Sequence, residues 1–156
     1  RALHTLDRSI RDVRNLSHNL QPPALDEHSL KYELERLIAD YQTMLTDTKY
    51  RLEYAISDGL LSTDTAIALY RVCQECLLNI FKHAKATLVT LQLIQNNNRI
   101  ELMIADNGQG FDEKKLSEGI GLQNIRSRLT FTNNLSTSIQ SIPTKGTRIQ
   151  LAFDCA

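Results

Sequence analysis

The sequence has no net charge, no long hydrophobic run and no visible signal peptide. Its 156 residues contain 18 Lys and Arg against 18 Asp and Glu. This balance argues against nucleic acid or an anionic membrane as the main partner, because both bind basic surfaces. No apolar run approaches the ~20 residues that a helix needs to cross a bilayer. We therefore expect a globular chain that contacts neither nucleic acid nor membrane.

Cysteine is too scarce for a disulfide framework, since only Cys73, Cys76 and Cys155 occur. Cys73 and Cys76 have the C-x-x-C spacing of redox sites and of half a zinc site. No second Cys/His pair stands at zinc-like spacing, and both residues fall on the apolar side of a predicted helix. We interpret them as packing residues and expect reduced thiols, as in cytosolic proteins.

Glycine is sparse as well, and four of the six glycines fall within residues 104–122. An apolar run in this stretch ends in Asp106, and the glycines follow it: Gly108, Gly110, Gly119 and Gly121. Glycine lets a ligand approach the backbone, and a helix N-terminus presents free N–H groups to an anion. A carboxylate followed by two glycine turns suits a nucleotide. Most G-x-G pairs are ordinary turns, however, so the stretch needs support from elsewhere in the chain.

Hydrophobic periodicity predicts helices and strands in an alternating order. The expected helices cover 2–20, about 27–45, 63 to about 84, and 121–132, and the expected strands cover 51–57, 88–95, 99–105, about 135–141 and 147–153. Antiparallel-looking strands interrupted by helices favour an α+β fold. We expect a two-layer sandwich with helices on one face of a mixed sheet.

The predicted helix 2–20 carries an apolar stripe at heptad spacing, which consists of Leu3, Leu6, Ile10, Val13 and Leu20. Such a stripe needs another helix to bury it, or else the helix lies on its own domain. The chain begins without Met and inside this helix, so we expect it to be a piece of a longer protein.

The helix 63–84 carries four polar residues on one face: Glu75, Asn79, Lys82 and His83. At about 100° per residue they share an arc of roughly 100°. The amide oxygen of Asn79 is a ligand type that Mg²⁺ accepts, and Lys82 can offset phosphate charge. Glu75 can orient or deprotonate a nucleophile. Any one of these residues could simply lie on a solvated helix face. Chance poorly explains the presence of all four on one face, followed along the chain by a strand that ends in Asp-x-Gly-x-Gly.

These residues resemble the motifs of the GHKL ATPases and histidine kinases. The segment from Glu75 to Ala84 looks like the N box, and Asp106 to Phe111 resembles the G1 box. Gly119 to Leu122 resembles the G2 box, and Gly146-Thr147 matches the closing Gly-Thr of the family. Residues 13–25 also resemble the second dimerisation helix of one subfamily, the sensor kinases that pair with helix-turn-helix response regulators.

The resemblance implies a role for each motif residue in binding ATP and Mg²⁺. Asp106 would accept a hydrogen bond from the adenine amino group, with Thr147 assisting. Asn79 would ligate Mg²⁺ with Glu75 beside it, while Lys82 and His83 would lie near the phosphates. Gly108 and Gly110 would let the chain pass close to the nucleotide. Gly119 and Gly121, which Leu122 follows, would present backbone amides to phosphate.

At the level of the whole protein, the resemblance implies a sensor histidine kinase. Residues 1–23 would be the second helix of the dimerisation and histidine-phosphotransfer hairpin, and 24–156 the catalytic ATP-binding domain. The full-length homodimer would pass the γ-phosphoryl of ATP to a histidine and then to an aspartate of a response regulator. We expect a cytoplasmic location, with an upstream sensor region as the place for any membrane anchor.

Two features depart from the common kinase pattern. Only about eight residues separate Gly110 from Gly119, so the lid over the nucleotide is short, which fits the subfamily. The phosphoacceptor histidine of these kinases lies on a first dimerisation helix, which we do not find in this chain. We interpret His4, His18 and His28 as surface or interhelical residues.

Three other functions remain open at this point. In a hydrolysing ATPase of the gyrase or MutL kind, Glu75 would activate water, but such proteins have longer lids and a transducer domain. An anti-sigma-factor serine kinase would lack the segment 17–25. A degenerate module that no longer binds ATP would not keep the residues of all the boxes.

Overall fold

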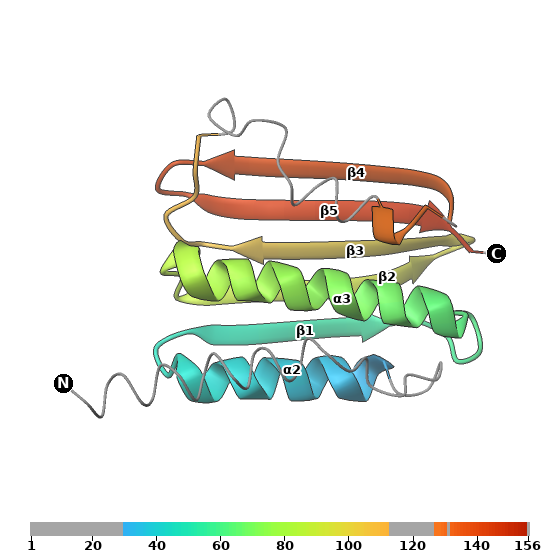
Figure 1. Ribbon diagram of the computed structural model, residues 1–156, viewed down its shortest axis with the longest axis horizontal. Coiled ribbons are helices and arrows are strands. Elements are labelled where there is room, and N and C mark those ends of the chain that lie inside the picture. Colours follow the sequence, from blue (N-terminus) through green and yellow to red (C-terminus); the bar gives the residue numbers. More distant parts are fainter. Residues whose placement is uncertain (1–29, 113–126, 131, 156) are drawn as a thin grey trace.

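The computed structural model describes residues 30–112, 127–130 and 132–155 (Figure 1). Its elements follow in the order α2 (Leu30–Met44), β1 (Lys49–Ala55), α3 (Thr63–Asn79), the π-helical turn η1 (Ile80–Ala84), β2 (Leu88–Asn96), β3 (Arg99–Asp106), β4 (Asn133–Ile142) and β5 (Gly146–Asp154). The predicted helix 2–20 and most of the predicted helix 121–132 lie outside the described residues. Among the described helices, none has the length and apolar character needed to cross a membrane.

The five strands form one mixed sheet in the order β1-β2-β3-β5-β4. Strand β1 runs parallel to β2, and helix α3 makes the crossover between them, whereas the other neighbouring pairs are antiparallel. Strand β1 begins two residues earlier than predicted, because Lys49 pairs with Leu88 and its N–H donates to Thr87 O at 2.9 Å. The prediction of an α+β sandwich on a mixed sheet is confirmed.

Helix α3 begins where the sequence predicts. Ser62 precedes it in an extended conformation, and its side-chain oxygen accepts a hydrogen bond from Thr65 N at 3.2 Å. This bond satisfies one of the N–H groups that the first helical turn leaves without a partner. The cap therefore fixes the start of the helix that later carries Glu75 and Asn79.

The core lies between the helices and one face of the sheet. The predicted inward residues of β2 and β3 are all buried, namely Val89, Leu91, Leu93, Ile100, Leu102 and Ile104. The apolar side of α3 packs onto them with Leu69, Cys73 and Leu77, each no more than 1% exposed. Burial of such side chains is worth roughly 1.5–3 kcal/mol each, which makes this face the main source of stability.

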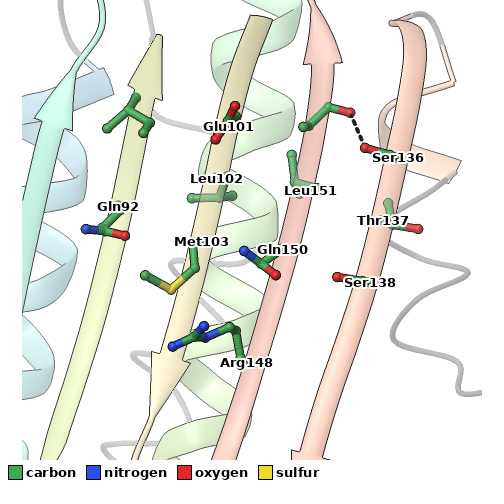
Figure 2. A pocket seen from close by; sticks show the side chains of 12 residues that line it. Gln92, Glu101, Leu102, Met103, Ser136, Thr137, Ser138, Arg148, Gln150 and Leu151 are labelled. Carbon is green, nitrogen blue, oxygen red and sulfur yellow. Dashed lines mark hydrogen bonds between the residues drawn. The ribbon is translucent and has the colours of Figure 1, made fainter. Parts of the chain in front are cut away.

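The opposite face of the sheet is polar and carries a shallow hollow of about 470 Å³. Figure 2 shows its lining side chains, among them Gln92, Met103 and Arg148, on the side of the sheet away from α3. The residues that line the hollow therefore do not include any that the sequence singles out for nucleotide binding, such as Asn79 and Asp106.

The end of the long helix differs from the prediction of a continuous α-helix to residue 84. Regular α-helix stops at Asn79, and Ile80 to Ala84 form a π-helical turn. The turn ends at Lys85, whose backbone is left-handed with φ of 53°. The carbonyls of His83 and Ala84 bond to Gln109, which is distant in sequence. Tertiary contacts thus shape this turn, and helical periodicity gives no sign of them.

We predict that the two helix cysteines are chemically inert in the native protein. Cys73 and Cys76 are 0% and 2% exposed, and burial raises the pKa of both thiols, that of Cys76 to about 12. Because the thiolate is the reactive form, native alkylation should modify Cys155 at least tenfold faster than either. Mass spectrometry of iodoacetamide-treated protein, native and in guanidinium, measures this difference. Native modification of Cys73 at the rate of Cys155 would contradict it.

Candidate functional site

Three segments that are far apart in the sequence meet at one end of the sheet. The end of α3 with η1, the end of β3 and the turn between β4 and β5 all lie on the left in Figure 1. The helix residues predicted to act on phosphate and the first glycine motif are thereby brought to the same end of the molecule.

Gly108 lets the chain after β3 pass directly against the end of the helix. A Cβ atom at this position would overlap the carbonyl oxygen of Ala84, so no larger residue fits without displacing η1. Gly110 adopts φ of +56°, and a Cβ there would overlap the carbonyl oxygen of Ile142. The two glycines therefore allow the chain after β3 to pack directly against the backbone of η1 and the backbone at the end of β4.

Asp106 is the last residue of β3 and pairs with Thr147 in β5. Its carboxylate accepts a hydrogen bond from Gly108 N at 2.8 Å. Partial burial raises the pKa of Asp106, while hydrogen bonds from the backbone N–H groups of Gly108 and Thr147 lower it and only partly offset the burial. The sheet thus holds a half-buried carboxylate at its end, an acceptor that a ligand N–H could satisfy.

Ser141 positions Thr147 beside this carboxylate, although nothing in the sequence marks it. The side chain of Ser141 is buried, and its oxygen accepts a hydrogen bond from Phe111 N at 2.9 Å. The same oxygen lies 2.9 Å from the hydroxyl of Thr147, with which it shares a hydrogen bond. The start of β5 is in this way tied to the chain that leaves the glycine turn.

Asn107 and Gln109 occupy the variable positions of the Asp-x-Gly-x-Gly motif, and both form tertiary bonds that the sequence does not reveal. The side-chain oxygen of Asn107 accepts from the N–H groups of Thr87 and Leu88, each at 2.9 Å. Asn107 thereby fixes the entry into β2. An Asn before Gly is a common turn signal, which is the one hint of such a role in the sequence.

Gln109 connects all three segments of this end. Its backbone N–H donates to Ala84 O at 2.7 Å, and its side-chain Nε2 donates to His83 O at 2.6 Å. Its own carbonyl accepts from Thr144 N at 2.7 Å. The end of the helix, the glycine turn and the β4–β5 turn are therefore joined through a single residue.

The helix residues predicted for chemistry lie on the exposed side of this end. Asn79 is the last residue of α3 and is exposed, and its side chain makes no capping hydrogen bond to η1. Lys82 and His83 are exposed on η1. Within the described ranges, neither of them has an ion-pair partner. The two basic side chains are thus available to an anionic ligand as far as the described residues go.

Glu75 lies further back on α3 and is partly buried. Its Oε2 is 3.9 Å from Nε of Arg128, a residue to which no motif in the sequence gives a role. Among the described residues no three His, Cys, Asp or Glu side chains cluster as a protein metal site would require. The predicted G2 residues Gly119, Gly121 and Leu122 lie outside the described residues.

Comparisons with known proteins agree with this geometry. The family model described as histidine kinase-, DNA gyrase B- and HSP90-like ATPase matches residues 64–156. The chain is 34% identical over 141 residues to the signal transduction histidine-protein kinase/phosphatase UhpB of Salmonella typhimurium, covering 90% of this chain and 28% of that protein. It is 32% identical over 139 residues to the sensor histidine kinase MctS of Rhizobium johnstonii, covering 86% and 30%. The chain thus spans less than a third of these relatives.

The fold is also found among solved histidine kinases. The kinase domain of the blue-light-activated histidine kinase of Erythrobacter litoralis superposes with a TM-score of 0.68 at 18% identity, covering 90% of this chain and 68% of that one. The family model matches more than half of the chain. The chain therefore belongs to the histidine kinase-, DNA gyrase B- and HSP90-like ATPase family, and it carries an ATP-binding domain of the sensor histidine kinase type.

Proposed function

We propose that residues 24–156 are the catalytic domain of a two-component sensor histidine kinase and bind ATP through the motif residues at the end of the sheet. Residues 1–23 would belong to the dimerisation hairpin. The observation that supports the proposal best is the close approach at Gly108, which joins the helix end that bears Asn79 to the strand end that bears Asp106. Adenine and phosphates of one nucleotide would then contact both.

The strand end would recognise adenine. The ionised carboxylate of Asp106 accepts hydrogen bonds only, so it would select the exocyclic amino group of adenine over the carbonyl of guanine. Its half-buried position supports this role, because an acceptor removed from water gains more from a ligand donor than an exposed one does. The Thr147 hydroxyl, held by Ser141 at 2.9 Å, would complete the polar edge.

The helix end would bind the phosphates. Lys82 and His83 are the exposed basic residues of η1, and Gly119, Gly121 and Leu122 would supply backbone amides to the same phosphates. The amide oxygen of Asn79, which makes no capping hydrogen bond to η1, fits Mg²⁺, which is usually held by few protein ligands together with phosphate oxygens and water. When bound, Mg²⁺ would neutralise charge on the β- and γ-phosphates. The absence of a multi-ligand cluster in the described residues is compatible with such a shared site.

The contact between Glu75 and Arg128 supports phosphoryl transfer over ATP hydrolysis. A general base for water needs a carboxylate oxygen that is directed at that water and within hydrogen-bond reach of it. Glu75 Oε2 instead faces the Arg128 guanidinium, at 3.9 Å from its Nε. Glu75 would instead orient groups around the metal.

In the whole protein, the γ-phosphoryl of ATP would pass to an imidazole nitrogen of a histidine outside this domain, and ADP would leave. The phosphoryl group would then move to an aspartate of a response regulator, with a helix-turn-helix output domain in the subfamily that residues 13–25 resemble. The protein would act as a homodimer on the cytoplasmic side, where ATP and the regulator are available. Catalysis of this kind rests on positioning and charge neutralisation.

We predict that Asp106→Asn weakens ADP binding about tenfold to a hundredfold. An amide in this place can present its N–H₂ group to the adenine amino group and leave a half-buried polar atom without a partner, at a cost on the order of 1–3 kcal/mol. Isothermal titration calorimetry with ADP measures the change. Asp58→Asn, in an exposed turn at the opposite end of the sheet, is the matched control and should bind as the wild type does. Unchanged affinity in Asp106→Asn would refute the adenine assignment.

We predict that Asn79→Ala weakens Mg-ATP binding at least tenfold more than it weakens binding of metal-free ATP. The expected loss is that of a metal ligand, so it should disappear when the ion is removed. Titrations with excess Mg²⁺ and with EDTA give the two affinities. Asn98→Ala, in the exposed turn between β2 and β3, should change neither. Equal losses in both conditions would show that Asn79 does not act through the metal.

A further inference from the structure

We propose that Gln109 is a positioning residue that fixes the direction in which η1 presents Lys82 and His83 to the phosphates of the nucleotide. The inference rests on the proposed function, since it deepens the role of the same site. Gln109 stands at a variable position of its motif, and neither composition nor periodicity marks it. Its three hydrogen bonds to two distant segments carry the inference.

The turn η1 depends on contacts from outside the helix. A π-helical turn places each hydrogen bond five residues apart, and it is wider and rarer than an α-helical turn. It ends in the left-handed backbone of Lys85, a conformation that costs an ordinary side chain free energy. The last carbonyls of any helix also lack partners within it. Unless these groups are bound elsewhere, the turn has alternatives close in free energy.

Gln109 supplies partners for the last two carbonyls of η1. Its backbone N–H and side-chain amide donate to adjacent carbonyls, at 2.7 Å to Ala84 O and 2.6 Å to His83 O. The side-chain bond acts on the peptide of His83 itself, so it limits rotation of the backbone that carries the imidazole. Without it, one bond to Ala84 would remain, and the peptide of His83 could reorient.

The backbone of Gln109 is itself held on both sides. Thr144 N donates to its carbonyl at 2.7 Å, and the flanking Gly108 and Gly110 lie against the carbonyls of Ala84 and Ile142 with no room for a Cβ. The side-chain amide of Gln109 therefore extends to the His83 carbonyl from a backbone whose position is fixed. This arrangement transmits the position of the β4–β5 turn to η1.

The other half of η1 is anchored independently. The ring of Phe81 contacts the ring of the buried Tyr41 in α2, with centroids 5.6 Å apart and planes tilted by 52°. Aromatic pairs at such distances and tilts attract one another. Phe81 thus holds the beginning of the turn and Gln109 holds its end. Loss of the Gln109 amide should loosen the end alone and leave α3 in place.

The test compares wild type, Gln109→Met and Gln140→Met in the 156-residue chain. Methionine keeps the length of glutamine and removes the amide without adding charge. Gln140 is exposed on β4 and serves as the matched control. Each variant is titrated with ADP and, by competition, with adenosine, which carries the base but no phosphate. Hydrogen–deuterium exchange of residues 80–86 and the melting temperature are measured in parallel.

We expect Gln109→Met to weaken ADP binding about threefold to tenfold, the loss of one hydrogen bond, with adenosine affinity unchanged. Exchange of residues 80–86 should rise, while Gln140→Met matches the wild type throughout. ADP affinity equal to that of the wild type would overturn the positioning role. Equal losses for ADP and adenosine, with a lowered melting temperature, would also overturn it and show a merely structural residue. A wild type that binds no ADP would instead refute the proposed function.

Discussion

The close approach of the turn after β3 to the end of the α3–η1 helix is the constraint on which the rest of this site depends. At Gly108 no side-chain atom separates the two backbones, and the N–H of Gln109 bonds directly to Ala84 O at 2.7 Å. The distance between the helix layer and this end of the sheet is thereby set by main-chain contact. Under the proposed function, residues from either side would then occupy fixed places relative to one nucleotide, which is the positioning that phosphoryl transfer requires.

The half-buried carboxylate at the strand end shows what such a site costs the fold. The pKa of Asp106 is raised by burial, so the folded protein holds the proton of this group more tightly than the unfolded chain does. The stability that Asp106 contributes to the fold is therefore present at pH values below the pKa that it has in the unfolded chain. It is lost as the pH rises through the pKa of the folded state, above which the carboxylate is ionised and its hydrogen bonds only partly offset its burial. A hydrogen bond from the adenine amino group would offset the remaining cost of burying the ionised carboxylate. Titratable groups with a shifted pKa cluster at functional sites.

Periodicity and motif spacing located most of the elements and the start of α3, but not the end of that helix or the bonds between elements. The alternation in β2 and β3 correctly predicts which side chains are buried, because one face of the sheet packs on helices. The same reasoning extends α3 unbroken to residue 84, since a helical wheel treats every turn alike. Periodicity does not predict the change to a π-helical turn after Asn79, because the residues that shape this turn are Tyr41 and Gln109, which lie outside the helix.

The sequence by itself determined the fold class, the family motifs and the chemistry of the individual side chains, since these follow from residue type, spacing and local pattern. Asp106, Asn79 and the glycines are recognisable without coordinates for that reason. Only the tertiary structure decided which residues hold the motifs together. Ser141, Gln109 and Arg128 act through contacts across 30, 25 and 53 residues, to Phe111, Ala84 and Glu75. Local patterns carry no information about such contacts, because they form only when the packed sheet brings distant backbones within hydrogen-bond reach.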